Sequence, residues 1–323
     1  MARTRCYRVG VLTAEDFPLA ELSEYLQQES ALVWVDLCSP DLEELQLVAD
    51  ELGLHSLAVE SAASGHQRPK FNQYTGHDFF TVYAVHLDES SGQLTTGEIA
   101  AFITPTALIT VRKDDEFPLD GLLTRWNDNA EHTRFGVGAL VHGLMDFVVD
   151  GHFDAVQSLD EEIEQLEDVL FDDRPHDGDV QRRSFELRKS LVNLRRVVLP
   201  MREVVNTMMR RDVGLVPAEM TAYYEHVYDN VLRATEWTES LRDLVTTIVE
   251  TNLTIQGNRL NVITKKVTSW AAIIAVPTAV TGFYGQNVPY PGFLETSGFV
   301  ASSLLIVALS VGLYVAFKRR DWL

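Results

Sequence analysis

Positive charge is scarce in this sequence of 323 residues. Only 27 lysine and arginine residues stand against 47 aspartate and glutamate residues, which gives a formal net charge of −20 at pH 7. A protein that binds nucleic acid needs a basic surface to displace counterions from the phosphates. The composition therefore argues against nucleic acid as a partner, and it is compatible with a protein that handles cations.

Cysteine is also rare, since Cys6 and Cys38 are the only two. A disulfide framework and a cysteine-rich zinc site are therefore disfavoured, which suits a reducing cytoplasm. The N-terminal sequence MARTRCYRVGVLTAEDF lacks the unbroken apolar core of a signal peptide, so we expect the N-terminal part to stay in the cytoplasm. We find no phosphate-binding loop and no pairing of a nucleophile with a base, so we predict no catalytic residues, no enzymatic activity and no organic cofactor.

Charge is absent from two segments near the C-terminus, VTSWAAIIAVPTAVTGF (267–283) and GFVASSLLIVALSVGLYVAF (298–317). Each has about the length that crosses a ~30 Å hydrocarbon core at ~1.5 Å per residue. A pair of buried core helices is the alternative, but such a hairpin is rarely flanked by clusters of charge at the end of a chain. We therefore predict transmembrane helices at 267–284 and 299–317.

The charges around these two segments predict their orientation. Lys265 and Lys266 precede the first segment, and a basic tail at 318–323 follows the second. The connecting loop at 285–298 contains no lysine or arginine. Because positive residues concentrate on the cytoplasmic side, we expect both termini in the cytoplasm and the loop outside a multi-pass protein of the plasma (inner) membrane.

The first part of the chain, residues 1–150, mixes strand and helix patterns and predicts a cytoplasmic α/β domain. PDLEELQLVADELG (40–53) has helical periodicity between Pro40 and Gly53. Short apolar runs rich in β-branched residues indicate four strands, at 31–37, 78–87, 98–104 and 107–113.

The region 151–216 is predicted to consist of cytoplasmic amphipathic helices. Helical periodicity covers two segments, of which the first already begins at 144 and ends at 173, and the second covers 180–211. The helix-breaking sequence RPHDGD (174–179) separates them. The first helix is rich in aspartate and glutamate. Such a run is either an ordinary solvated face or a surface that concentrates cations by its single sign of charge.

A stalk helix is predicted for residues 217–266. No proline occurs between Pro217 and Pro277, and Gly257 is the only glycine in that interval. If the helix continues through the first apolar segment, it is about 100 Å long at ~1.5 Å per residue. A helix of that length needs neighbours, so we expect it to run from the cytoplasmic domain into the membrane.

A stripe of small and polar residues follows one face of this helix, because spacings of three and four keep positions aligned in a helix. Its members are Asn261, Thr264, Thr268, Ala271, Ala275, Thr278, Gly282 and Gly285. The stripe indicates either close helix packing, for which small residues are favoured in membranes, or the lining of an aqueous path. Two spans cannot enclose a path, so the second interpretation requires a closed ring of identical subunits. Val267 and Leu260 are candidates for an apolar constriction along that path.

The sequence WAAIIAVPTAVTGFYGQN (270–287), the basic tail KRRDWL and the upstream segment VYDNVLRATEWTESLRDLV (227–245) resemble the CorA family of divalent-cation channels. The resemblance implies a funnel-shaped homopentamer with a cytoplasmic α/β domain, a stalk, a first span that lines the pore and a second that faces lipid. It also implies passive uptake of Mg²⁺, with Co²⁺ and Ni²⁺ often carried too. An inside-negative membrane potential favours such entry by ~2.3 kcal/mol per charge for each 100 mV.

The family's signature glycine and asparagine fall on Gly285 and Asn287, which the resemblance makes the selectivity filter together with Gln286. The family usually has methionine at the middle position, and the following loop also departs from the usual sequence, which leaves the metal open. The Asn287 carboxamide suits a hydrated Mg²⁺, because Mg²⁺ keeps its waters and a neutral acceptor releases them easily. Gln286 either braces the loop, which we favour, or adds further carboxamides.

The resemblance also implies a cytoplasmic regulatory site in which bound divalent cations, Mg²⁺ among them, hold the channel closed. Asp88 matches one side of that site, and the stalk side is His226, flanked by Glu225 and Asp229. Histidine is a poor ligand for Mg²⁺ and a better one for Zn²⁺, Co²⁺ or Ni²⁺. The alternative is that His226 is an ordinary surface histidine.

Two other functions stay open from the sequence. One is a transporter of Zn²⁺ or another transition metal within the same family. The other is a membrane-anchored scaffold, whose stalk mediates assembly without conducting ions.

Overall fold

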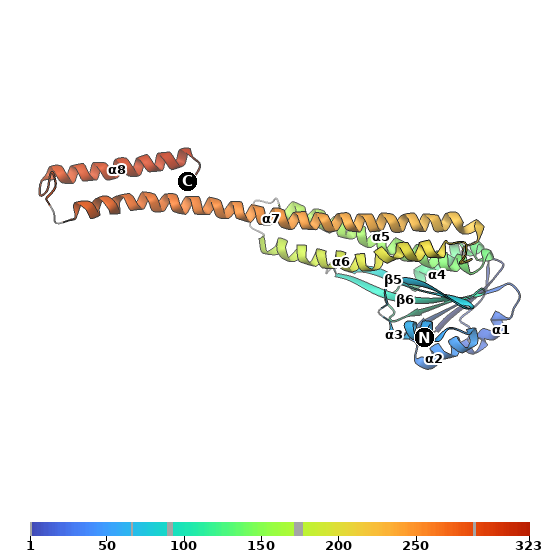
Figure 1. Ribbon diagram of the computed structural model, residues 1–323. Coiled ribbons are helices and arrows are strands. Elements are labelled where there is room, and N and C mark those ends of the chain that lie inside the picture. The colour runs from blue at the N-terminus through green and yellow to red at the C-terminus, as the bar shows by residue number, and fades with distance from the viewer. Residues whose placement is uncertain (1, 66, 89–92, 171–176, 287–288) are drawn as a thin grey trace. The chain divides into compact units, whose positions relative to one another are not determined.

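The computed structural model describes residues 2–65, 67–88, 93–170, 177–286 and 289–323 (Figure 1). It contains two compact units, Met1–Ile248 and Val249–Leu323. The first unit is an α/β fold. The second is a hairpin of two helices.

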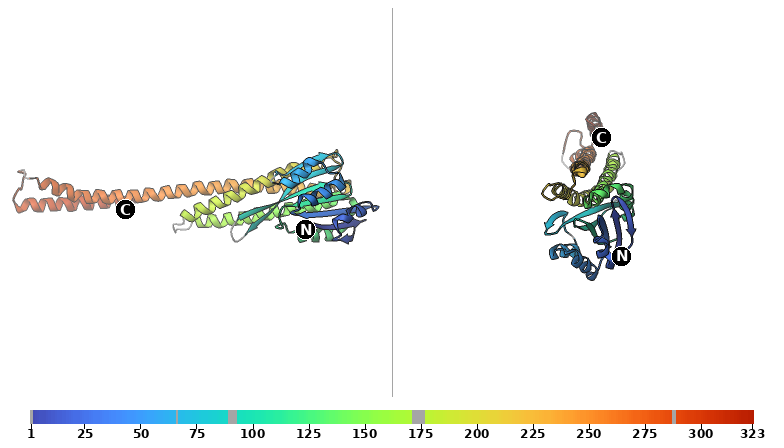
Figure 2. Two further views of the ribbon diagram at one scale, coloured as in Figure 1. Left: turned by 90° about the horizontal axis from the view of Figure 1, so that it is seen from below. Right: turned by 90° about the vertical axis from the view of Figure 1, so that its right-hand side faces the viewer.

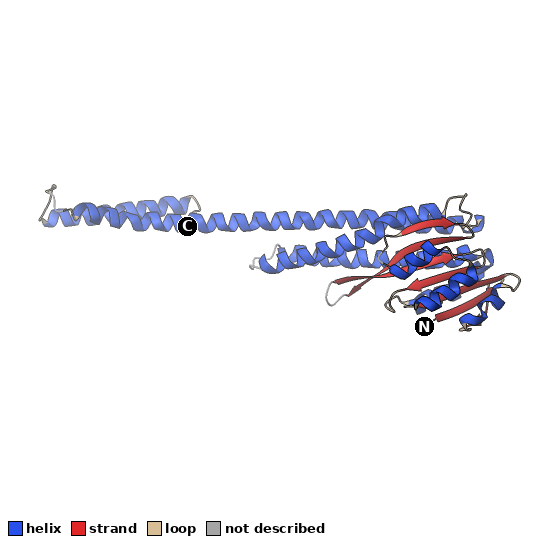
Figure 3. Ribbon diagram, turned by 60° about the horizontal axis from the view of Figure 1, so that its bottom comes forward, coloured by secondary structure: helices blue, strands red, loops and turns tan. Residues whose placement is uncertain are grey.

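The first unit is built on a seven-stranded sheet with the strand order β2-β1-β3-β7-β6-β5-β4, drawn in red in Figure 3. β3 and β7 pair in parallel, and all other neighbours in the sheet are antiparallel. The strands are β1 (Ala2–Arg8), β2 (Val11–Glu15), β3 (Ala31–Cys38), β4 (Lys70–Tyr74), β5 (His77–Asp88), β6 (Gln93–Ile103) and β7 (Ala107–Arg112).

Helices cover both faces of this sheet (Figure 2). Successive side chains of a strand point to opposite faces, so Trp34 packs in one hydrophobic core while Val33 and Val35 pack in the other. One face carries η1 (Leu19–Glu21), α1 (Leu22–Leu26), α2 (Leu42–Leu52) and α3 (Ser56–Ser64). The other carries α4 (Leu119–Asp128), η2 (Ala130–Phe135), α5 (Val137–Leu170), α6 (Asp177–Met208), η3 (Ala218–Met220) and the first turns of α7 (Thr221–Tyr284).

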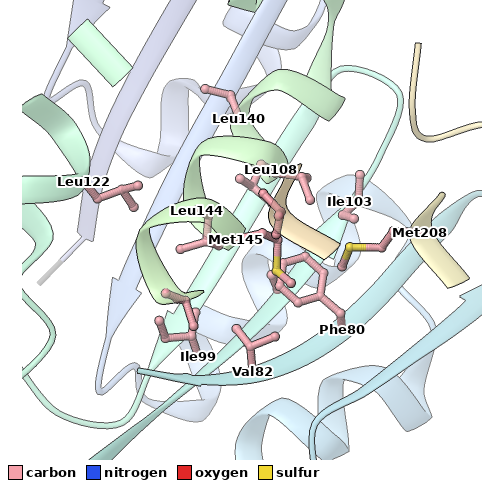
Figure 4. Packing of buried hydrophobic residues seen from close by; sticks show 14 of the residues in the cluster. Phe80, Val82, Ile99, Ile103, Leu108, Leu122, Leu140, Leu144, Met145 and Met208 are labelled. Carbon is pink, nitrogen blue, oxygen red and sulfur yellow. The ribbon is translucent and has the colours of Figure 1, made fainter. Parts of the chain in front are cut away.

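The larger core lies between the sheet and α5 (Figure 4). Phe80 and Val82 from β5 and Ile99 from β6 meet Leu144 and Met145 from α5, and all five side chains are buried. Each buried side chain of this size stabilises the fold by ~1.5–3 kcal/mol. This packing holds α5 rigidly on the sheet and gives α6 and the start of α7 a surface to pack against.

The α/β fold class is confirmed, and the four strands expected from the sequence are β3, β5, β6 and β7. The helix expected at 40–53 is α2. Its N-cap is Asp41, whose side chain accepts a hydrogen bond from the Glu44 backbone N–H at 2.8 Å, and it ends at Gly53 with a φ of 63°. These are the capping residues that helix ends favour, although the N-cap is one residue beyond the expected Pro40.

The helix break expected at 174–179 is partly wrong, because α6 already begins at Asp177. Residues 174–176 lie outside the described part of the chain. α5 begins at Val137 and runs unbroken to Leu170.

The second unit pairs the C-terminal part of α7 with α8 (Thr296–Arg319), which lie side by side in Figures 1 and 2. α7 has 64 residues and continues through Pro277 as expected, which makes it about 96 Å long at ~1.5 Å per residue. Both α7 and α8 contain a stretch long and apolar enough to cross a membrane. These two stretches coincide with the transmembrane helices predicted from the sequence.

Candidate functional site

The face of α7 that packs against α8 is apolar. Ser269 is fully buried there, and Ile273, Val276 and Val280 are half-buried on the same side of the helix. On α8, the positions with reduced exposure recur at the same helical spacing. They are Gly298, Ser302, Ser303, Ile306, Ser310, Leu313 and Phe317.

The small and polar stripe predicted from the sequence lies on the opposite side of α7. Successive residues in a helix are turned by about 100°, which puts the stripe roughly opposite Ser269. Every predicted pore-lining position is exposed in the single chain: Asn261, Thr264, Val267, Thr268, Ala271, Ala275, Thr278 and Gly282. The stripe therefore does not serve the packing of α7 on α8, and its surface is available to water or to other copies of the chain.

The end of the stripe is a tight turn at Gly285. Its backbone N–H donates to the Thr281 carbonyl at 2.8 Å, and a Cβ at Gly285 would lie only 2.9 Å from that oxygen. Glycine is thus the residue that fits without a shift of the backbone. Gln286 is exposed, and its side chain makes no hydrogen bond within the described part of the chain, so its bracing role stays a prediction. Asn287 lies outside the described residues.

Aromatic residues tie the two sides of the loop together. The Tyr290 hydroxyl donates to the Tyr284 carbonyl at 3.1 Å, and the two rings meet edge to face at 4.9 Å. Tyr290 also contacts Phe293, with ring centroids 5.3 Å apart. These contacts join Tyr284 at the end of α7 to Tyr290 and Phe293, and sequence reasoning missed them because only the path of the chain brings the rings together.

A second tie closes the loop at the start of α8. The backbones of Gly292 and Gly298 approach so closely that a Cβ at Gly298 would lie 2.3 Å from the Gly292 carbonyl oxygen. Gly292 has a φ of +87°, a conformation that L side chains rarely adopt. Neither glycine was singled out from the sequence, although glycine in a short loop is the available signal.

The predicted regulatory residues Glu225, His226 and Asp229 are exposed on the first turns of α7. The His226 ring Nε2 lies 3.3 Å from the Asn230 side-chain nitrogen, which donates to it. Asp88 ends β5, and its side chain lies outside the described part. Leu87 and Asn230 line one cavity of about 580 Å³, so the end of β5 is close to this part of α7. Among the described residues no group of three or more His, Cys, Asp or Glu side chains is arranged to hold a metal ion.

His226 also lines a cavity of about 300 Å³ that contains two further histidines, His132 and His142. Burial lowers the pKa of His142, an effect that the nearby Asp146 carboxylate only partly offsets. Beside it, the Arg125 guanidinium donates to Asp146 at 2.7 Å and to Asp150 at 2.6 Å. Sequence reasoning missed this cluster, because its members come from η2, α4, α5 and α7.

Upstream of the stripe, α7 carries acidic residues in the same seven-residue register. Asp229, Glu236, Asp243 and Glu250 are followed at equal steps by Gly257, Thr264, Ala271, Thr278 and Gly285. All nine positions are exposed in the single chain. Only Asp229 among the four acids was singled out from the sequence, and for a different reason. Their single sign of charge raises the local concentration of cations.

Comparisons with known proteins agree with this architecture. Residues 29–319 match the family model described as CorA-like Mg2+ transporter protein. The cobalt/magnesium transport protein CorA of Thermotoga maritima is 26% identical over 92% of this chain and 85% of its own length. The solved complete structure of the CorA magnesium transporter from Methanocaldococcus jannaschii superposes with a TM-score of 0.82 at 20% identity, covering 100% of this chain and 99% of that one.

The zinc transport protein ZntB of Pectobacterium carotovorum is also similar, at 22% identity over 82% of this chain and 80% of its own length. Relatives that carry different metals thus match the same chain at comparable identity, and the family model covers the α/β fold, the stalk and both spans. With its two transmembrane helices and its divalent-cation transporting relatives, the chain is a metal-ion transporter rather than an enzyme, and it belongs to the CorA-like Mg2+ transporter protein family.

Proposed function

We propose that this protein is a homopentameric channel for the passive uptake of hydrated Mg²⁺, and that it also accepts Co²⁺ or Ni²⁺. The observation that carries the proposal is the exposed stripe of α7, which faces away from α8. A polar stripe facing lipid is costly, because the bilayer core satisfies no polar groups. A closed ring of identical chains turns this face toward a shared axis and leaves α8 to face the lipid.

The filter of this channel consists of Gly285, Gln286 and Asn287 at the outer mouth. Gly285 permits the tight turn, and the aromatic contacts of Tyr290 hold the loop. The Asn287 carboxamides of the ring accept hydrogen bonds from the waters of Mg²⁺ and leave its inner shell intact. Because Mg²⁺ gives up water reluctantly, a neutral ring that grips the hydrated ion binds it weakly enough for release.

Below the filter, Thr278, Gly282 and Asn261 line a polar path. Val267 and Leu260 are 63% and 64% exposed in the single chain, and they form the apolar constriction that closes by dewetting. Residues 217–266 act as the stalk, with both termini in the cytoplasm of a plasma-membrane protein. The inside-negative potential then favours entry of a divalent ion by ~4.6 kcal/mol per 100 mV, twice the value for one charge.

Intracellular divalent cations regulate this channel at the start of α7. In this proposal Glu225, His226 and Asp229 supply ligands from the exposed face of α7, and Asp88 supplies one from β5, whose Leu87 lines the same cavity as Asn230 of α7. A single chain does not assemble three metal ligands among its described residues, so the proposed site draws on a neighbouring copy. The acidic residues Asp229, Glu236, Asp243 and Glu250 on the same helix raise the local concentration of cations near this site.

A transition metal such as Zn²⁺ is the second candidate substrate, because a relative named zinc transport protein matches this chain at an identity comparable to that of the cobalt/magnesium relatives. Competition flux into liposomes with Mg²⁺, Co²⁺ and Zn²⁺ separates the two candidates. A magnesium channel shows Mg²⁺ uptake that Co²⁺ inhibits and that internal Mg²⁺ reduces. Uptake of Zn²⁺ without uptake of Mg²⁺ assigns the protein to zinc transport.

The pore assignment is tested by Asn287→Ala. We expect Mg²⁺ uptake to fall at least tenfold while the oligomer, measured by size-exclusion chromatography with light scattering, stays intact. Asn258→Ala is the matched control, because Asn258 is an exposed asparagine of α7 that lies off the stripe. Unchanged uptake in Asn287→Ala contradicts the filter. Absence of uptake in the wild-type protein favours a non-conducting scaffold, and a dimer in detergent contradicts the pentamer.

A further inference from the structure

An arginine-lined groove follows the C-terminal half of α6 in the first unit. Two cavities of about 680 and 530 Å³ share Arg68, Pro69, Leu199 and Pro200, so they form one continuous groove. One wall is α6 and the other is the segment that leads into the edge strand β4. The lining residues of α6 extend from Asn193 to Asn206, a span of about 20 Å at ~1.5 Å per residue.

The charge of this groove is opposite to that of the chain. Its charged lining residues are Arg68, Arg195, Arg196, Arg202 and Glu203. Arg195 donates to Glu239 at 3.2 Å. Arg68, Arg196 and Arg202 form no ion pair with any residue that the structure describes. Three arginines that pair with no carboxylate of the described residues thus line one groove, in a chain with a net charge of −20.

The shape and the remaining lining suit a ligand with an anionic and an apolar part. Each cavity is within the size range of small-molecule sites. Leu199, Pro200 and Pro69 give the groove an apolar surface, while Tyr83 and Thr96 contribute to its lining from β5 and β6. A concave surface of this kind differs from the flat solvated face that exposed arginines on a helix ordinarily form.

The chemistry of arginine indicates which class of ligand fits the groove. The planar guanidinium presents a fork of N–H donors that matches phosphate oxygens in bidentate geometry. We propose that the groove binds an organic phosphate of nucleotide size, with its phosphoryl groups held by Arg68, Arg196 and Arg202 and its remainder against Leu199 and Pro200. A phospholipid headgroup shares this chemistry, so the experiment distinguishes a soluble phosphate from a lipid one. The inference does not depend on transport activity.

Isothermal titration of the full-length protein in detergent, in Mg²⁺-free buffer with EDTA, tests the proposal. The probes are sodium ATP, sodium tripolyphosphate and adenosine, which lacks phosphate. We expect ATP and tripolyphosphate to bind and adenosine to fail, with affinity falling as salt screens the charges. Arg68→Ala and Arg196→Ala should each weaken binding about tenfold or more, because hydrogen bonds to charged groups are the strong ones.

Arg188→Ala is the matched control, because Arg188 is exposed on the same helix and lines neither cavity. It should bind as the wild-type protein does, and so should the pore variant Asn287→Ala, which separates this site from transport. Arg196-dependent binding to phosphatidylglycerol vesicles without binding of soluble phosphates supports a lipid source of the same phosphate chemistry. Three results would overturn the proposal. They are equal losses in Arg188→Ala and Arg196→Ala, Arg196-dependent binding of polyglutamate alone, and no binding of ATP, tripolyphosphate or phosphatidylglycerol vesicles.

Discussion

Replacement of Gly282 by leucine separates the role of the α7 stripe from the stability of the chain. Gly282 is exposed on the stripe, and a Cβ built there meets no atom within 4 Å. Leucine is a better helix former than glycine by up to ~1 kcal/mol. Within a single chain the substitution should therefore be neutral or slightly stabilising, so a loss of transport reflects the path and not the fold.

In the proposed ring, the substitution places five leucine side chains around the axis one turn before Gly285. An apolar constriction blocks a hydrated ion by excluding the water that the ion keeps. A tenfold fall in flux corresponds to a barrier higher by ~1.4 kcal/mol, which is only ~0.3 kcal/mol for each of five copies. We therefore expect Gly282→Leu to reduce Mg²⁺ flux at least tenfold and Gly282→Ala to have an intermediate effect.

The assay is Mg²⁺ influx into liposomes followed with an internal Mg²⁺-sensitive dye, with the oligomer checked by light scattering. Gly312 provides the matched control, because it is an exposed glycine of α8 whose added Cβ also meets nothing within 4 Å. Gly312→Leu should conduct as the wild-type protein does. Wild-type flux in an intact Gly282→Leu oligomer, or equal losses in both variants, would refute the assignment of the stripe to the path.

Two further predictions concern the α/β fold. Asp36→Asn should lower the free energy of unfolding by ~3–5 kcal/mol, because it removes the buried carboxylate that bonds the buried Arg112 at 2.8 Å and leaves only the exposed Asp115 as its partner. Asp115→Asn removes an exposed partner of the same arginine and should lower the free energy of unfolding by less than ~1 kcal/mol. Urea denaturation monitored by tryptophan fluorescence measures the free energy of unfolding of both variants. Burial lowers the pKa of His152 to about 4, so protons bind the unfolded chain more readily and stability falls by ~3 kcal/mol as the pH drops from 6.5 to 4. His152→Gln should flatten that part of the urea-midpoint profile, whereas His86→Gln at an exposed histidine should leave it unchanged.

Strands β3 and β7 were predicted because most of their residues are apolar. All six residues of β7 are buried, and so are seven of the eight residues of β3, and the charged residues Asp36 and Arg112 within them pair with each other. β1 and β4 were missed because charged and polar residues interrupt them. Arg5 in β1 is buried where it bonds Glu15 of β2 and Asn127 of α4, and no local sequence pattern contains these tertiary contacts.

The features of the candidate site also divide into those that local sequence predicts and those that depend on tertiary structure. The stripe of α7 was predictable because helical periodicity is local, and the capping of α2 was predictable for the same reason. The contact of Tyr290 with Tyr284 and the close approach of Gly298 to Gly292 depend on the path of the loop, which its sequence does not specify. The filter residue Asn287 was assigned by resemblance to the family, and that assignment stays a prediction.

The seven-residue spacing along α7 also predicts how copies of this helix pack in the proposed assembly. A straight α-helix drifts by ~20° per heptad, so over the eight heptads from Asp229 to Gly285 the register would turn by about 160°. On an isolated straight helix, the acidic positions and the filter glycine would thus face nearly opposite directions. A left-handed supercoil removes that drift, and it forms when several helices wind around one another. The register therefore predicts that copies of α7 supercoil about a common axis, which places the carboxylates of the stalk and the mouth of the pore on one continuous path.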